Sequence, residues 1–183
     1  MERYDYQIVS SITPAYSLLR HGVGDSKAFA CVYAAMCRQA GLECMVVSGT
    51  GHGEAHAWNA VQIGKSWYYT DVTWDDPVGG DGTIYYAYFN LTRAAMDLDH
   101  VAQQEYIPLP AAASTLYNYH VRNGSYTERY DQSQLARLLS RSNTVRVYVA
   151  GNTDAYIQSL RDNISAILAE AGIRDCTGFS YRV

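Results

Sequence analysis

The feature that most constrains the fold is a pair of strand-like runs on either side of Gly64-Lys65. Residues 56–63 read HAWNAVQI and residues 66–74 read SWYYTDVTW. Both runs are rich in aromatic and β-branched residues, and a short glycine-containing break between such runs is typical of a tight turn. The sequence therefore predicts an antiparallel hairpin that turns at these two residues.

This hairpin brings a histidine and an aspartate together. With the turn at residues 64–65, His56 lies opposite Thr73 and Trp58 lies opposite Asp71. Because side chains alternate along a strand, all four point to one face, and His56 and Asp71 are diagonal neighbours roughly 7–8 Å apart at the backbone. An imidazole and a carboxylate placed in this way suit a general base and the acid that orients it. An ordinary pair of surface polar residues is the alternative.

A helix is predicted upstream, over residues 26–40, where apolar residues recur at helical spacing and Gly41 follows as a stop signal. Ser26 opens this helix, directly after Asp25. The positive end of a helix dipole stabilises an anionic nucleophile such as a thiolate, so this is a favourable place for one. Serine is also a common N-cap, although Asp25 can cap equally well. Ser26 is therefore either an N-cap or a catalytic residue, and the sequence leaves both roles open.

Composition narrows the classes of partner. The 183 residues are 48% hydrophobic and 17% charged, which predicts a packed core. The net charge is -4 and the chain has no basic cluster, so we expect neither nucleic acid nor an anionic membrane as a partner. No apolar run approaches the roughly 20 residues that span a bilayer, and the polar, aromatic N-terminus does not predict a signal peptide.

No metal or other cofactor is predicted. The four cysteines occur at no spacing typical of a zinc site. They are Cys31, Cys37, Cys44 and Cys176. The acidic residues Asp75, Asp76 and Asp81 match no calcium-binding loop.

The pattern changes at residues 107–115, IPLPAAAST, whose prolines and small residues predict a linker. We therefore expect one domain over residues 1–106 and a second over residues 116–183. The second part alternates strand and helix patterns, which predicts a small α/β domain. The expected strands are 116–123, 144–151 and 176–183, and the expected helices are 132–141 and 154–172.

Four blocks of the first part, GDSKAFA, AGLEC, HAWNAV and GKSWYYTDVTWDD, resemble the transglutaminase-like superfamily, which shares its layout with papain-like cysteine proteases. The family has Gly-x-Cys at a helix start, then Ala-Gly-Ile/Leu, a His-Ala-Trp-Asn strand and Asp-x-Thr-Trp. The segment YFNLTRAAMDLDH is similar to the tail of bacterial members. The resemblance covers about Tyr4 to His100 and implies an α+β core, with a helix packed on an antiparallel sheet. It also implies a bacterial protein that acts at or outside the cell envelope.

The resemblance implies that His56 is the general base and Asp71 the orienting acid. Ser26 stands where the family has its nucleophilic cysteine. A serine hydroxyl is far less acidic than a thiol and does not form a resting ion pair with an imidazole at neutral pH.

Further residues are candidates for binding a ligand. Trp58 and Trp67 share the predicted face of the hairpin. His52 and Glu54 flank it in the loop GTGHGE, for which a solvated loop is the alternative.

Three functions follow from these residues. The first is a catalytically impaired member of the family that binds a peptide, a protein or another amide-bearing ligand. The second is an active acyl-transfer enzyme, hydrolysing or transamidating an amide with Ser26, His56 and Asp71. The third is a non-catalytic interaction module in which the second domain binds the partner.

Overall fold

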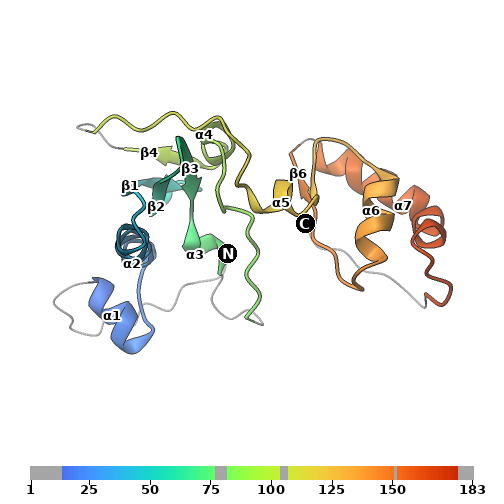
Figure 1. Cartoon of the computed structure of the whole chain (residues 1–183), viewed down its shortest axis with the longest axis horizontal. Helices are drawn as coiled ribbons and strands as arrows, with labels where there is room; N and C mark the ends of the chain where they lie inside the picture. The colour runs from blue at the N-terminus through green and yellow to red at the C-terminus, as the bar shows by residue number, and fades with distance from the viewer. Residues whose placement is uncertain (1–13, 77–81, 104–106, 151, 177–183) are drawn as a thin grey trace. The chain divides into compact units, whose positions relative to one another are not determined.

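The computed structural model describes residues 14–76, 82–103, 107–150 and 152–176 (Figure 1). The chain divides into two compact units, with the division after Tyr119. Each unit is described by itself. Among the described residues, no helix combines the length and the apolar character that a bilayer crossing requires.

The first unit is built on a four-stranded antiparallel sheet in the order β3-β2-β1-β4. Helix α2 packs on β1 and β2, and α1 packs on α2 (Figure 1). The strands are β1 (Cys44–Gly51), β2 (Glu54–Ile63), β3 (Ser66–Thr70) and β4 (His100–Ala102). The helices are α1 (Pro14–His21), α2 (Ser26–Gln39), α3 (Val72–Asp75) and α4 (Arg93–Met96). A helix on an antiparallel sheet is compatible with the α+β core expected from the sequence.

The hairpin at Gly64-Lys65 has the predicted register, since Asn59 pairs with Thr70 and Ile63 with Ser66. The ladder ends at Thr70, however, one pair before Trp58 would meet Asp71. The expected strand stops here because the Asp71 side chain accepts hydrogen bonds from two backbone N–H groups and caps α3. The predicted cross-strand pairs beyond Thr70 are therefore wrong, although the His56 and Asp71 side chains still meet.

The Gly-rich loop predicted over residues 49–54 is mostly strand. β1 runs on to Gly51, and β2 begins at Glu54. The turn between them consists of His52 and Gly53, both with positive φ angles, +48° and +84°. Two successive positive φ angles are typical of the tight type I′ turn, which fits the twist of a hairpin and permits continuous pairing up to the turn.

The face of the sheet under α2 forms the apolar core of the first unit. Val61 and Tyr68 from the sheet pack there with Ala34 and Cys37 from α2. Asn59 lies on the same face and is fully buried. Its Nδ2 donates to the Ala30 carbonyl at 2.9 Å and to the Met45 carbonyl at 3.3 Å, which ties α2 to the sheet.

Residues 107–115, predicted as a linker, lie against β3 of the first unit. The hydroxyl of Tyr69 donates to the Pro110 carbonyl at 3.0 Å, and that of Tyr68 donates to Ser114 Oγ at 2.8 Å. The backbone carbonyl of Ala112 accepts from the N–H of Arg93 at 2.8 Å. A stretch without periodicity still offers backbone acceptors to its neighbours, so composition alone is a weak guide to this boundary.

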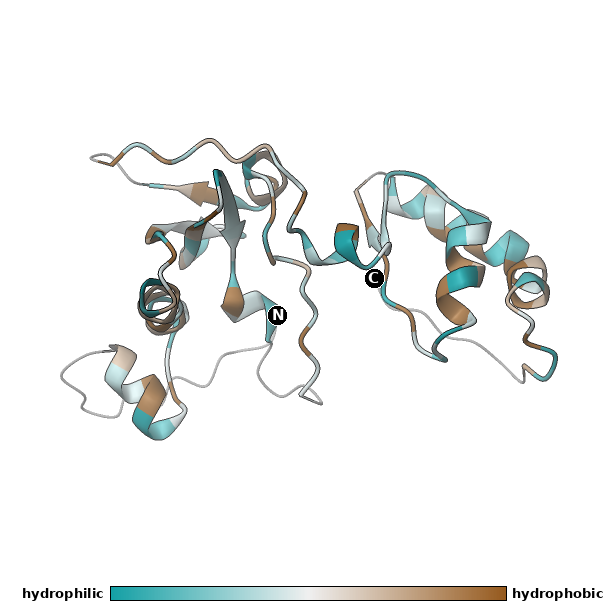
Figure 2. Ribbon diagram, in the orientation of Figure 1, coloured by the Kyte–Doolittle hydropathy of each residue, from teal (hydrophilic) through white to brown (hydrophobic). Residues whose placement is uncertain are grey.

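The second unit has a core between two helices, α6 (Gln132–Leu139) and α7 (Thr153–Glu170). Leu135 and Ala136 of α6 are buried with Tyr156 and Ile167 of α7. In Figure 2 both helices carry hydrophobic beside hydrophilic residues, as amphipathic helices do. Two short parallel strands, β5 (Tyr126–Thr127) and β6 (Tyr148–Val149), accompany them.

One strand expected in this part is wrong. Residues 116–123 contain the short helix α5 (Tyr119–Arg122), which stands at the division between the units. The chain turns where the Asn118 N–H bonds to the Thr115 carbonyl, and Gly124 follows α5 with a φ of +68°. The strand expected over 144–151 is confined to β6, and the final strand expected over 176–183 lies almost wholly outside the described residues.

The Asn59 contacts yield a stability prediction. Asn59→Ala leaves two carbonyl acceptors without this donor, so the free energy of unfolding of the first unit should fall by about 1–3 kcal/mol. Urea unfolding followed by tryptophan fluorescence measures this unit alone, because the three tryptophans, Trp58, Trp67 and Trp74, all lie in it. Gln62→Ala is the control, a half-buried position on the sheet face away from α2. Equal losses in the two variants would contradict the prediction.

Candidate functional site

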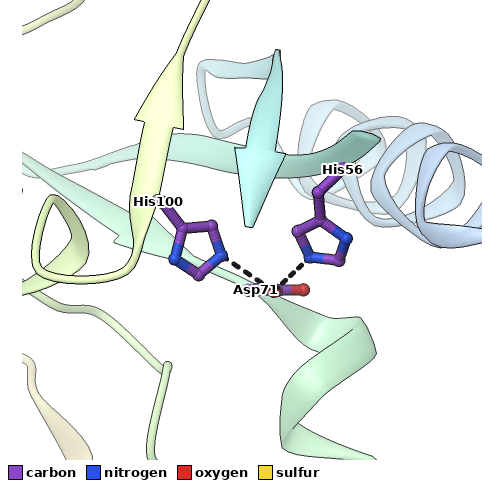
Figure 3. A group of neighbouring side chains, drawn as sticks. All are labelled: His56, Asp71 and His100. Carbon is purple, nitrogen blue, oxygen red and sulfur yellow. Dashed lines mark hydrogen bonds and ion pairs between the residues drawn. The ribbon is translucent and has the colours of Figure 1, made fainter. Parts of the chain in front are cut away.

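The centre of the site is a short contact between His56 and Asp71 (Figure 3). His56 Nε2 and Asp71 Oδ2 are 2.6 Å apart, and the Asp71 side chain is fully buried. An ionised carboxylate only accepts, so the imidazole donates from Nε2. In the neutral form of His56, the lone pair then lies on Nδ1, the atom that accepts a proton when the ring acts as a base.

Asp71 is fixed by both of its oxygens. Oδ1 accepts from the backbone N–H groups of Thr73 at 2.9 Å and Trp74 at 3.3 Å at the start of α3. Oδ2 accepts hydrogen bonds from the imidazoles of His56 and His100. Burial alone raises the pKa of Asp71, but the hydrogen bonds from His100 and His56 outweigh burial and hold the pKa below 3.8, its ordinary value. The carboxylate is therefore charged in the folded protein.

His100 is part of the site, and the sequence did not single it out. It lies on β4, is 1% exposed, and its Nε2 is 3.2 Å from Asp71 Oδ2. Its Nδ1 is 2.6 Å from Asp99 Oδ1, and Asp99 Oδ2 accepts from the Tyr88 hydroxyl at 2.7 Å. Burial lowers the pKa of His100, but the two carboxylates raise it more, so that it lies above 6.5, the ordinary value. His100 lies opposite Gly51 because β4 pairs with β1, which is distant in the sequence. No local sequence pattern predicts this pairing.

Trp74 covers the histidine–aspartate pair, and it too was not singled out. Its ring stacks on His56 and on His52, with ring centroids 4.8 Å apart in both cases. Gly51 makes room for this stack, because a Cβ at this position would come within 2.8 Å of the Trp74 ring and 3.2 Å of His56 Cδ2. The glycine thus permits the aromatic stack that fixes the His56 ring.

Ser26 is the first residue of α2 and is half-buried. Asp25 is the N-cap, with its Oδ1 accepting from the Ala28 N–H at 2.8 Å, so the helix does not use Ser26 as its cap. In Figure 3 the Nδ1 of His56 lies on the side away from Asp71, where the turns of the blue helix are drawn. Among the described residues, no hydrogen bond joins Ser26 to His56 or Asp71.

The residues predicted to bind a ligand lie in different surroundings. Trp58 is 1% exposed, with its ring 4.8 Å from that of His100, so it belongs to the core beneath the site. Trp67 lines a separate hollow of about 510 Å³ beside Arg38. It pairs with Gln62, six residues along β2 from His56, or about 20 Å at the spacing of a strand. His52 and Glu54 are exposed beside the site, and His52 stacks on Trp74.

His56, Asp71 and His100 are also the kinds of residue that ligate metals. Their donor atoms lie within 4.8 Å of one another. In a tetrahedral site with metal–ligand bonds of about 2.0–2.1 Å, neighbouring donors are about 3.3 Å apart. The 2.6 Å between His56 and Asp71 is shorter than this and is typical of a charge-assisted hydrogen bond, so the pair fits a shared proton better than a shared metal ion. Of the acidic loop, Asp75 is buried and Asp81 lies outside the described residues.

Asp75 yields a prediction for pH dependence. Burial and the nearby charge of Asp71 raise its pKa from 3.8 to about 7, although the Tyr88 N–H donates to it at 2.7 Å. The folded state thus binds a proton that the unfolded state has lost, so stability falls as the pH rises from about 4 to about 7. Asp75→Asn keeps the acceptor and removes this titration.

The thermal midpoint of the first unit, followed by tryptophan fluorescence, checks this prediction. Between about pH 4.5 and 6.5 the midpoint should fall with rising pH in the parent and stay level in Asp75→Asn. The pKa of His100 is also raised, so His100 also stabilises the folded state at low pH. That contribution to stability is lost only above pH 6.5, outside the range of this measurement. Parallel slopes in the two proteins would contradict the assignment.

The contact between Gly51 and Trp74 yields a coupled pair of substitutions. Gly51→Ala should destabilise the first unit, because the new Cβ overlaps Cζ2 and Cη2 of the Trp74 ring. Trp74→Phe removes those ring atoms, so it should cost less in the Gly51→Ala background than in the parent. A double-mutant cycle of urea unfolding measures this coupling, which we expect to be about 0.5–3 kcal/mol. Simple additivity would show that the two residues do not compete for space.

Comparisons of the sequence with known proteins bear on the first unit. Residues 1–72 match the sequence model of the family described as the Transglutaminase-like superfamily, and this range includes Ser26, His56 and Asp71. The chain is also similar to the human (Homo sapiens) protein named kyphoscoliosis peptidase, with 26% identity over 137 residues. That match covers 65% of this chain and 21% of the relative, so the chain spans about a fifth of the relative's length. The first unit therefore carries a domain of the transglutaminase-like superfamily.

Proposed function

We propose that this transglutaminase-like domain binds a peptide, a protein or another amide-bearing ligand beside His56, and that Ser26 at the nucleophile position impairs acyl transfer. The observation that carries the proposal is the 2.6 Å contact of His56 Nε2 with Asp71 Oδ2. A buried carboxylate that fixes the tautomer of an imidazole is the arrangement of a general base and its orienter. This contact supports a role for His56 as general base, and α2, which packs on β2, begins with the proposed nucleophile position.

The impairment follows from the chemistry of oxygen and sulfur. A cysteine at a helix N-terminus beside a histidine becomes a thiolate, because the helix dipole and the imidazolium both stabilise the negative charge. The Ser26 hydroxyl gains too little from the same surroundings to ionise at neutral pH. It needs its proton removed during the attack itself, with donors placed for the resulting oxyanion. The backbone N–H of Ser26, at the first helical position and without a partner in the helix, is one such donor.

An active hydrolase or transamidase that uses Ser26 is the second candidate, and one observation favours it. Asp71 holds the His56 proton on Nε2, which leaves Nδ1 to accept the proton of a hydroxyl. In this mechanism Ser26 attacks the amide carbonyl, His56 takes the hydroxyl proton and then returns it to the departing amine. Water or a second amine completes the transfer and regenerates Ser26.

Ser26→Cys separates the two candidates. We expect the parent to bind short peptides without turnover, and the cysteine variant to cleave a p-nitrophenyl acyl ester and a peptide p-nitroanilide. The new thiol should also react with iodoacetamide at pH 6 at least about tenfold faster than an ordinary cysteine, because the site favours the thiolate. The parent controls for the natural cysteines, of which Cys176 is exposed.

His56→Ala, in both backgrounds, is the second control. Turnover by the parent that disappears with His56→Ala would favour the second candidate over the first. Activity in Ser26→Cys that persists after His56→Ala would remove His56 from the mechanism. No peptide binding by the parent and no reaction by Ser26→Cys would contradict both candidates and favour an interaction module.

A further inference from the structure

The starting observation is that both ring nitrogens of His100 face carboxylate oxygens. Nε2 is 3.2 Å from Asp71 Oδ2, and Nδ1 is 2.6 Å from Asp99 Oδ1. Carboxylates accept and do not donate when ionised, so each nitrogen needs a hydrogen. An imidazole with hydrogens on both nitrogens is a cation. The neighbours thus favour the imidazolium form of His100, and Figure 3 shows it beside Asp71, across from His56.

This cation changes what Asp71 does to His56. If a buried carboxylate had His56 as its one counter-charge, it would hold the proton on His56, since losing that proton would leave a buried unpaired anion. Here Asp71 has a second partner, and the ring centroids of His56 and His100 are only 5.4 Å apart. A cation at that distance opposes a second cation, so His56 can be neutral while Asp71 still orients it.

The surrounding ionisable groups support this arrangement. Asp99 belongs to the turn before β4 and is itself held by the Tyr88 hydroxyl at 2.7 Å. Asp75 on α3 lies close enough that the charge of Asp71 raises its pKa to about 7, and His52 lies beyond the Trp74 ring. The rings of Trp58, Trp74 and Tyr88 also lie against His100, and the two tryptophans carry no charge. The His100 side chain is fully buried, so solvent does not screen its interaction with Asp71 and His56.

We propose that His100 is a positioning residue, a buried imidazolium clamped between Asp99 and Asp71, which fixes Asp71 and keeps His56 available as a neutral base. The inference rests on the second candidate under the proposed function, an active hydrolase or transamidase, because that mechanism uses His56 as a neutral base. It suits a hydroxyl at position 26 in particular: a hydroxyl needs a free base, whereas a thiol pairs with an imidazolium.

Nuclear magnetic resonance of the parent tests the charge of His100 directly. Nitrogen chemical shifts of the imidazole should show both ring nitrogens of His100 protonated at pH 6, and the ring should titrate at higher pH than an ordinary histidine. The five histidines can be assigned with single substitutions. A His100 ring that is neutral at pH 6 in the folded parent would overturn the proposal without recourse to any variant.

Two variants test the effect on His56. His100→Gln keeps an N–H group that can reach Asp71 but removes the charge, so the pKa of His56 should rise by about one unit or more, a tenfold higher proton affinity. Asp99→Asn keeps an oxygen acceptor for His100 Nδ1 and removes the carboxylate charge, so His100 should titrate at lower pH and the pKa of His56 should rise. Asp97→Asn is the matched control, an exposed carboxylate paired with Arg93 on α4, and it should change neither value.

The outcomes separate this inference from the proposed function. An unchanged pKa of His56 in a folded His100→Gln or Asp99→Asn protein would overturn the inference, even if Ser26→Cys reacts and the parent binds peptides. A raised pKa of His56, together with an inert Ser26→Cys and no peptide binding, would support the charge arrangement and contradict the proposed function. If Ser26→Cys is active, the His100→Gln substitution should also shift the basic limb of its kcat/KM profile, where the imidazolium of the ion pair loses its proton, to higher pH.

Discussion

The site depends on the carboxylate of Asp71. One of its oxygens caps α3, and the other accepts hydrogen bonds from the imidazoles of His56 and His100. A single buried side chain therefore sets the start of a helix and the orientation of His56. These hydrogen bonds also keep the carboxylate ionised in a place where burial favours its neutral form. The local structure after β3 and the electrostatics of the site therefore have one common origin.

At the start of α2, capping and the proposed nucleophile position also fall to different residues. The side chain of Asp25 accepts from one of the first N–H groups of the helix, that of Ala28, which leaves the side chain of Ser26 outside the capping interaction. The fold thus retains a helix N-terminus with a polar side chain that the helix itself does not need. The superfamily match covers residues 1–72, a range that includes Ser26, His56 and Asp71.

Much of the first unit could be predicted from local patterns. The strands around Gly64-Lys65, their register and the contact of His56 with Asp71 follow from alternation and turn chemistry. What was missed comes from non-local pairing or from side chains that override a pattern. His100 reaches the site through the pairing of β4 with β1, and Trp74 through an α3 that begins where a continued strand was expected. At the division between the units, alternation at residues 116–123 predicted a strand where the chain forms turns and α5.

The turn at His52-Gly53 has a consequence for how relatives of this domain can vary. Its length sets the height of the His52 ring over Trp74, and Trp74 in turn lies against His56. Most surface hairpin tips accept extra residues freely. Here an insertion would lift the outermost ring of a three-ring stack, so natural length variation at this tip should be accompanied by a compensating change at position 74.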